Sequence, residues 1–101
     1  MELALESGRV MTDPTEADLR SAMAGEQFAI LGIDPDTYIQ CAAIGDQPGH
    51  YILEYQDGSL DRHYQAGDGP ITMDRVVSAF TKYLRRDASW LDDFRWEPLD
   101  L

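Results

Sequence analysis

Asp61 and His63 are the two residues whose types and spacing come closest to a catalytic pattern. They stand two positions apart in an expected strand, so both side chains lie on one face and the carboxylate could polarise the imidazole. A hydrolase would also need a nucleophile, and the sequence does not place Cys41 or Ser59 beside this pair. We therefore interpret the two residues as a surface Asp–His pair and keep a small hydrolase as the minor alternative.

The sequence also lacks motifs that bind metal ions or phosphate groups. His50, His63 and Cys41 are the available nitrogen and sulfur ligands, and neither C-x-x-C nor H-E-x-x-H occurs. Residues 34–36 (Asp-Pro-Asp) begin like a calcium loop but lack its later glycine and glutamate, so they predict a turn. Residues 67–70 (Gly-Asp-Gly-Pro) are too short for a phosphate-binding loop. We expect no metal, no cofactor and no enzymatic activity.

The charge balance bears most directly on the kind of partner. Nineteen Asp and Glu residues stand against eight Lys and Arg residues, which gives a net charge of −11. Nucleic acids and anionic membranes are bound through basic surfaces, so we expect neither partner. Asp46 and residues 54–56 (Glu-Tyr-Gln) are spaced like an acidic nuclease core, but a chain this acidic produces such spacing by chance. The charge favours encounter with a basic protein, and the alternative is that it serves solubility alone.

Length and composition predict one domain spanning residues 1–101. Hydrophobic residues make up 44% of the chain and ten side chains are aromatic, which is enough for a hydrophobic core. The first six residues are acidic and lack the parts of a signal peptide, and no apolar run approaches the roughly 18 residues of a membrane span. A single cysteine, Cys41, is typical of a reducing compartment. We expect a cytoplasmic protein.

Turn residues divide the chain into short elements. A helix is expected from Thr12 to Gly25, with Thr12 or Asp13 as its cap and Pro14 in its first turn. A second helix follows Thr72, since Met73, Val76, Val77, Phe80 and Leu84 recur at helical spacing. Its last turn carries Lys82, Arg85 and Arg86, which complement the helix dipole. Residues 88–94 predict a short third helix, and strands are expected over residues 1–10, 28–33, 38–44, 51–56, 60–65 and 95–101.

This order predicts an α+β fold, β-α-β-β-β-β-α-β, in which two helices pack on one face of a mostly antiparallel sheet. Strand alternation then assigns the faces. The side chains expected to face the helices are Ile39, Cys41, Ala43, Tyr51, Leu53, Tyr55, Leu60 and Tyr64. The side chains expected to be open to solvent are Tyr38, Gln40, Glu54, Gln56, Asp61, His63 and Gln65. The aromatic residues Trp90, Phe94 and Trp96 are expected in the core.

The second half of the chain resembles a known group of proteins. Residues 54–64 (EYQDGSLDRHY) lead into a helix containing residues 79–84 (AFTKYL), and Trp90 and residues 94–97 (FRWE) follow. This arrangement resembles the small acidic immunity proteins encoded beside bacterial polymorphic and contact-dependent toxins, and uncharacterised bacterial proteins of similar size. The resemblance implies an inhibitor that occludes the active site of its toxin with acidic side chains. Such proteins share no catalytic residues, so the resemblance transfers an idea of function and no site.

The sequence thus predicts a non-enzymatic binding protein that engages a basic partner as an immunity or antitoxin-type inhibitor. A self-associating structural domain, such as a homodimer, is the alternative. The residues expected to contact the partner come from the open face and the hairpin beside it: Tyr38, Glu54, Gln56, Asp57, Asp61 and His63.

Overall fold

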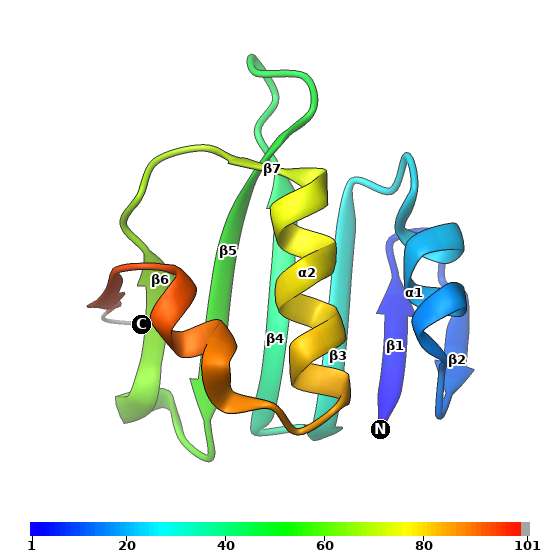
Figure 1. Cartoon of the computed structure of the whole chain (residues 1–101), viewed down its shortest axis with the longest axis horizontal. Coiled ribbons are helices and arrows are strands. Elements are labelled where there is room, and N and C mark those ends of the chain that lie inside the picture. Colours follow the sequence, from blue (N-terminus) through cyan, green and yellow to red (C-terminus); the bar gives the residue numbers. More distant parts are fainter. Residues whose placement is uncertain (100–101) are drawn as a thin grey trace.

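The computed structural model describes residues 1–99 and shows an antiparallel eight-stranded sheet with helices, an α+β fold (Figure 1). The strands are β1 (Glu2–Leu5), β2 (Val10–Thr12), β3 (Phe28–Asp34), β4 (Thr37–Ala43), β5 (His50–Asp57), β6 (His63–Ala66), β7 (Ile71–Thr72) and β8 (Trp96–Pro98). The helices are α1 (Glu16–Met23), α2 (Met73–Leu84) and the short 3-10 helices η1 (Leu60–Arg62) and η2 (Ala88–Asp93). The strand order is β2-β1-β3-β4-β5-β6-β8, and β7 pairs with the start of β5.

The N-terminal segment is a hairpin, where a single strand was expected over residues 1–10. The chain turns at Gly8, whose φ of 91° lies in the left-handed region, and the Gly8 amide donates to the Leu5 carbonyl at 3.0 Å. β1 then pairs with both β2 and β3. The pair Ser7-Gly8 is the turn signal that the sequence interpretation overlooked.

The cap of helix α1 lies two to three residues later than expected, and Pro14 precedes the helix. Thr15 is the cap: its hydroxyl accepts from the Asp18 amide at 3.1 Å, and the Asp18 carboxylate accepts from the Thr15 amide at 2.9 Å. This reciprocal capping box satisfies two backbone N–H groups, which neither Thr12 nor Asp13 does. Leu19 and Met23 are fully buried against the sheet.

Helix α2 crosses the middle of the sheet, on the same side as α1 (Figure 1). Its buried stripe is Val76, Val77, Ala79, Phe80 and Tyr83. Two of the basic residues near its end make ion pairs with neighbouring helices: Lys82 with Asp93 at 2.6 Å, and Arg85 with Glu16.

The helix-covered face holds the core. Leu3, Leu31, Ile39, Leu53 and Phe80 are fully buried there. An aromatic cluster closes the β5–β8 side: Tyr55 stacks on Tyr64 with ring centroids 4.9 Å apart, and Trp90 and Trp96 meet Tyr55 edge-on. The C-terminal aromatic residues therefore belong to the core.

The segment after β5 departs from the expected strand over residues 60–65. Gly58 has a φ of 84°, and residues 60–62 then form η1, so that strand β6 begins at His63. Leu60, which was expected to face the helices, is 63% exposed in this turn. The predicted last strand, residues 95–101, is present as β8, although its final two positions lie outside the described residues. Within residues 1–99, no helix is long and apolar enough to cross a membrane.

Candidate binding site on the uncovered sheet face

The sheet face opposite the helices, here called the uncovered face, carries two rows of facing residues. One row follows the register Gly32–Tyr38–Gln56–His63 across β3 to β6. The neighbouring row follows Ile30–Gln40–Glu54–Gln65. Directly paired residues point to the same side, so the polar side chains of β4, β5 and β6 meet on this face.

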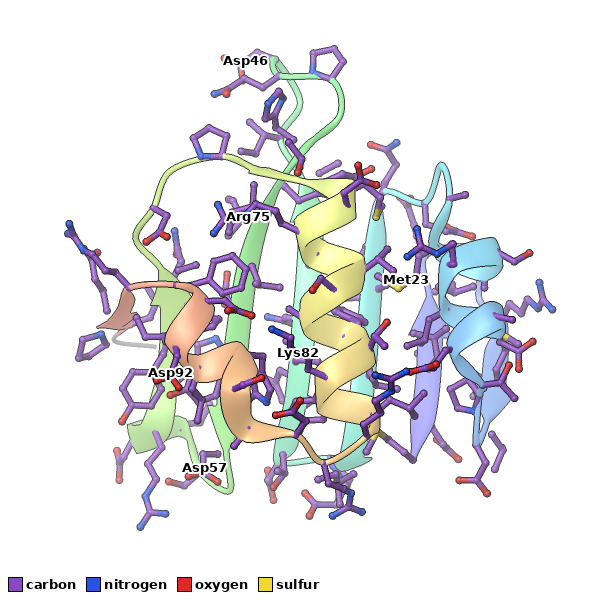
Figure 2. The ribbon with its side chains drawn as sticks, in the orientation of Figure 1. Met23, Asp46, Asp57, Arg75, Lys82 and Asp92 are labelled. Atoms are coloured by element: carbon purple, nitrogen blue, oxygen red, sulfur yellow. The ribbon has the colours of Figure 1, made fainter. Side chains whose placement is uncertain are left out.

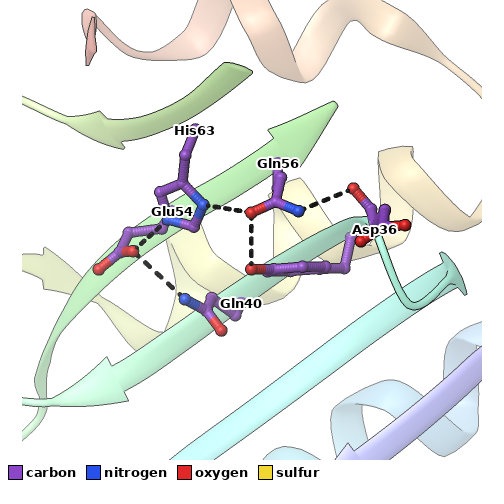
Figure 3. A network of polar contacts seen from close by, with 6 residues as sticks. Asp36, Gln40, Glu54, Gln56 and His63 are labelled. Carbon is purple, nitrogen blue, oxygen red and sulfur yellow. Dashed lines mark hydrogen bonds and ion pairs between the residues drawn. The ribbon is translucent and has the colours of Figure 1, made fainter. Parts of the chain in front are cut away.

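Gln56 lies at the centre of a hydrogen-bond network formed by these rows (Figure 3). Its Nε2 donates to the backbone carbonyl of Asp36 at 3.1 Å. Its Oε1 therefore faces the other way, where it accepts from the Tyr38 hydroxyl at 3.2 Å and meets His63 Nδ1 at 3.0 Å. Because an amide oxygen only accepts, His63 Nδ1 carries a proton.

His63 and Glu54 form the shortest contact of the network. His63 Nε2 lies 2.6 Å from Glu54 Oε1, a length typical of a charge-assisted hydrogen bond. The same carboxylate oxygen accepts from Gln40 Nε2 at 3.2 Å. Both ring nitrogens of His63 thus face oxygen atoms.

Tyr38 completes the network at its exposed side. Its ring lies edge-on to His63, with centroids 6.1 Å apart. Burial, and then the carboxylates of Glu54 and Asp36, raise the pKa of Tyr38 above its usual value. The hydroxyl therefore keeps its proton and donates to Gln56.

Burial corrects the expectation that Gln56 and His63 are open to solvent. They are only 4% and 3% exposed, although no helix covers their side of the sheet. Tyr38, Gln40 and Glu54 are partly exposed. The two buried residues consequently position the exposed ones and do not offer contact surface themselves.

Asp57 and Asp61 lie outside the network, in the turns that follow β5. Asp57 is paired with Arg62 at 3.8 Å, and both side chains are 65% exposed. Asp61 is exposed on η1 and makes no hydrogen bond or ion pair with the His63 ring, whose partners are Glu54 and Gln56. The expected Asp61–His63 pair is therefore wrong, because η1 removes Asp61 from the strand.

The turn between β3 and β4 adds two carboxylates that sequence reasoning missed as site residues. Thr37 pairs with Asp57, and the Gly58 amide donates to the Asp36 carbonyl at 3.0 Å, so the two turns lie side by side. Asp34, Asp36, Asp57 and Asp61 are all exposed here, and we call these four residues the acidic turns. The signal was available: in a meander, alternate turns fall at the same end of the sheet.

The residues that the sequence offered for a hydrolase or a nuclease do not lie together in the structure. Cys41 is buried on the helix-covered face, away from His63, and burial raises the pKa of its thiol to about 12. Asp46 lies in the loop at the opposite end of the molecule from Asp57 (Figure 2). Among residues 1–99, no group of three or more His, Cys, Asp or Glu side chains is arranged to hold a metal ion.

No model of a known protein family, no curated protein and no solved structure matches this chain. Its function must therefore be inferred from its own residues and their geometry.

Proposed function

We propose that this protein is a non-enzymatic binding protein, of the immunity or antitoxin type, that engages a basic protein through its uncovered face and acidic turns. The observation that carries the proposal is the network centred on Gln56, which fixes Tyr38 and Glu54 on a face that no helix covers. The resemblance of residues 54–97 to small acidic immunity proteins agrees with this function.

The distribution of charge supports a basic partner. Five of the eight Lys and Arg side chains are already paired with acids of the chain itself: Arg62, Arg75, Lys82, Arg85 and Arg95. The acidic turns carry four aspartates, and Arg62 is the only one of these five cations that pairs there. Complementary fields of this kind accelerate encounter and suppress wrong partners.

Preorganisation supports binding at this face. A side chain that is already held in one rotamer loses little entropy when a partner arrives. Glu54 is held by His63 and Gln40, and Tyr38 is held by Gln56. Tyrosine is also enriched among the residues that dominate interface energies.

A self-associating domain is the second candidate, favoured by the apolar part of the uncovered face. Phe28, Ala42 and Ile52 face one another across β3, β4 and β5, and Ile52 is 36% exposed. Two copies would bring together chains of charge −11 each, which opposes dimerisation at low salt. Sedimentation at micromolar concentration separates the candidates, since the first predicts a monomer.

The test is capture of a partner from native cell lysate with three forms of the protein. The wild type should retain a basic protein at low salt and release it at high salt, because screening weakens exposed charge pairs. Asp57→Lys/Asp61→Lys should weaken retention roughly tenfold at low salt. Asp46→Lys/Asp92→Lys is the matched control, and both double variants change the net charge from −11 to −7. Its two sites are exposed: Asp46 lies at the opposite end of the molecule from Asp57 (Figure 2), and Asp92 lies on η2, on the helix-covered side of the sheet.

The control variant should retain the partner like the wild type. Equal loss with both double variants would show that total charge matters and position does not, which contradicts binding at the acidic turns. Recovery of the protein alone, at either salt, would favour the self-associating domain.

A further inference from the structure

A hollow of about 560 Å³ lies over β1 and β3 on the uncovered face, outside the network centred on Gln56. Its volume is within the roughly 300–1,000 Å³ of typical ligand sites, although it is open to solvent. Ala4, Ile30 and Gly32 line it from the sheet, and Ile33 and Pro35 add apolar surface. The remaining lining residues are Met1, Glu2, Thr12, Asp13 and Asp34.

Gly32 keeps this hollow open. It faces Glu2 on one neighbouring strand and Tyr38 on the other, and the sheet has a bulge between Gly32 and Asp34. Its φ is not in the left-handed region, and a Cβ there would meet atoms at 3.4 to 3.6 Å, which is ordinary contact. The backbone therefore does not require glycine at this position, and the consequence of having no side chain is free space beside Tyr38.

Carboxylates give the hollow its charge. Glu2 and Asp34 come from different strands, are exposed, and make no ion pair within residues 1–99. Asp34 is also oriented, because its Oδ1 accepts from the Asp36 amide at 2.8 Å. Asp13 is already paired, at 3.0 Å, with the amino group of Met1.

We infer that this hollow receives an arginine side chain of the basic partner, an inference that rests on the proposed function. The aliphatic stem would lie on Ala4 and Gly32, and the guanidinium would reach Glu2 and Asp34. Long cationic side chains bury their stems on apolar surface while the charged end stays hydrated. A guanidinium has five donors in a plane and can serve two separate carboxylates, which an ammonium does less well.

The test is a titration of backbone amide NMR signals with N-acetyl-arginine amide, followed by N-acetyl-citrulline amide as the neutral analogue of the same shape. The arginine probe should shift the amides of Ala4, Gly32 and Ile33 in a saturable way, and citrulline should not. Glu2→Gln/Asp34→Asn should weaken the arginine effect by about tenfold. Asp46→Asn/Asp92→Asn is the matched control and should leave it unchanged.

Gly32→Ala narrows the hollow with both carboxylates in place. It should reduce arginine binding by about threefold while the thermal unfolding midpoint stays near that of the wild type. Equal shifts with arginine and citrulline would overturn the inference, as would arginine shifts confined to the amides of Asp57 and Asp61. The proposed function and the arginine site are tested independently, because the titration uses no partner protein. A protein that captures its basic partner but shows no arginine effect at the hollow keeps the proposed function and loses this site.

Discussion

The two faces of the sheet are stabilised in different ways, and strand β5 shows the contrast residue by residue. Tyr51, Leu53 and Tyr55 point to the helices, where apolar contact removes them from water. Glu54 and Gln56 point to the uncovered face, where no helix lies above them. Gln56 is nevertheless buried, and its amide forms hydrogen bonds with three neighbours. Polar side chains can thus be ordered on a face without a covering layer when they satisfy one another.

The largest expected effect tests how completely the helix-covered face is closed. Burial raises the pKa of Cys41 from 9.0 to about 12, so at pH 8 the native thiol should contain about a thousandfold less thiolate than an exposed one. Reaction with a disulfide reagent should therefore be slow in the native state and fast in denaturant. In the unfolded chain the Cys41 thiol loses its proton at a lower pH than in the native state. The free energy of unfolding should therefore fall as the pH rises from about 9 toward 12. Rapid native labelling at pH 8 would contradict a closed face.

Two adjacent residues of β5 allow the two faces of the sheet to be compared by mutation. Leu53 is fully buried under the helices, and Ile52 is 36% exposed on the other face. Leu53→Ala should lower the free energy of unfolding by about 2–5 kcal/mol, whereas Ile52→Ala should lower it by about 1 kcal/mol or less. Urea unfolding followed by circular dichroism measures both changes. Similar losses at the two positions would indicate that the uncovered face is buried in solution, as in a dimer.

The third prediction concerns the polar network, where we expect a smaller loss than the largest expected at Leu53. His63→Ala should lower the free energy of unfolding by about 2–3 kcal/mol, because Glu54 and Gln56 lose a partner in a poorly solvated position. A double-mutant cycle with Glu54→Ala should give a coupling of about 1–3 kcal/mol. Gln65→Ala is the control on the same face, since its side chain makes no hydrogen bond within residues 1–99. Zero coupling between Glu54 and His63 would remove preorganisation as an argument for binding.

Periodicity explains which parts of the fold could be predicted from the sequence. The α+β class and the antiparallel sheet followed from short strands, clear turns and the helical stripe of residues 73–84. Alternation also placed Cys41 and Leu53 under the helices, because the side-chain period of a strand is two. The errors occurred where backbone conformation overrides the pattern. Gly8 and Gly58 adopt left-handed φ values, which split the first strand and turned residues 60–62 out of the sheet.

The sequence predicted which residues lie together in the candidate site better than it predicted what each of them does there. Register brought Tyr38, Glu54, Gln56 and His63 together, but alternation alone could not show that Gln56 and His63 are buried. Their hydrogen bonds depend on the orientation of the Gln56 amide, which is set by the Asp36 carbonyl from another turn. The hollow beside Gly32 gave no signal at all, since it arises from a missing side chain next to a bulge.

The two ends of the sheet have a consequence for behaviour at high concentration. β2 and β8, the outermost strands in the sheet order, are only three residues long, and β8 ends in Pro98, which has no amide hydrogen to donate. Sheets grow into fibrils by adding strands to long, flat edges, and short edges with proline resist such growth. The two short outer strands thereby guard the protein against polymerising with copies of itself.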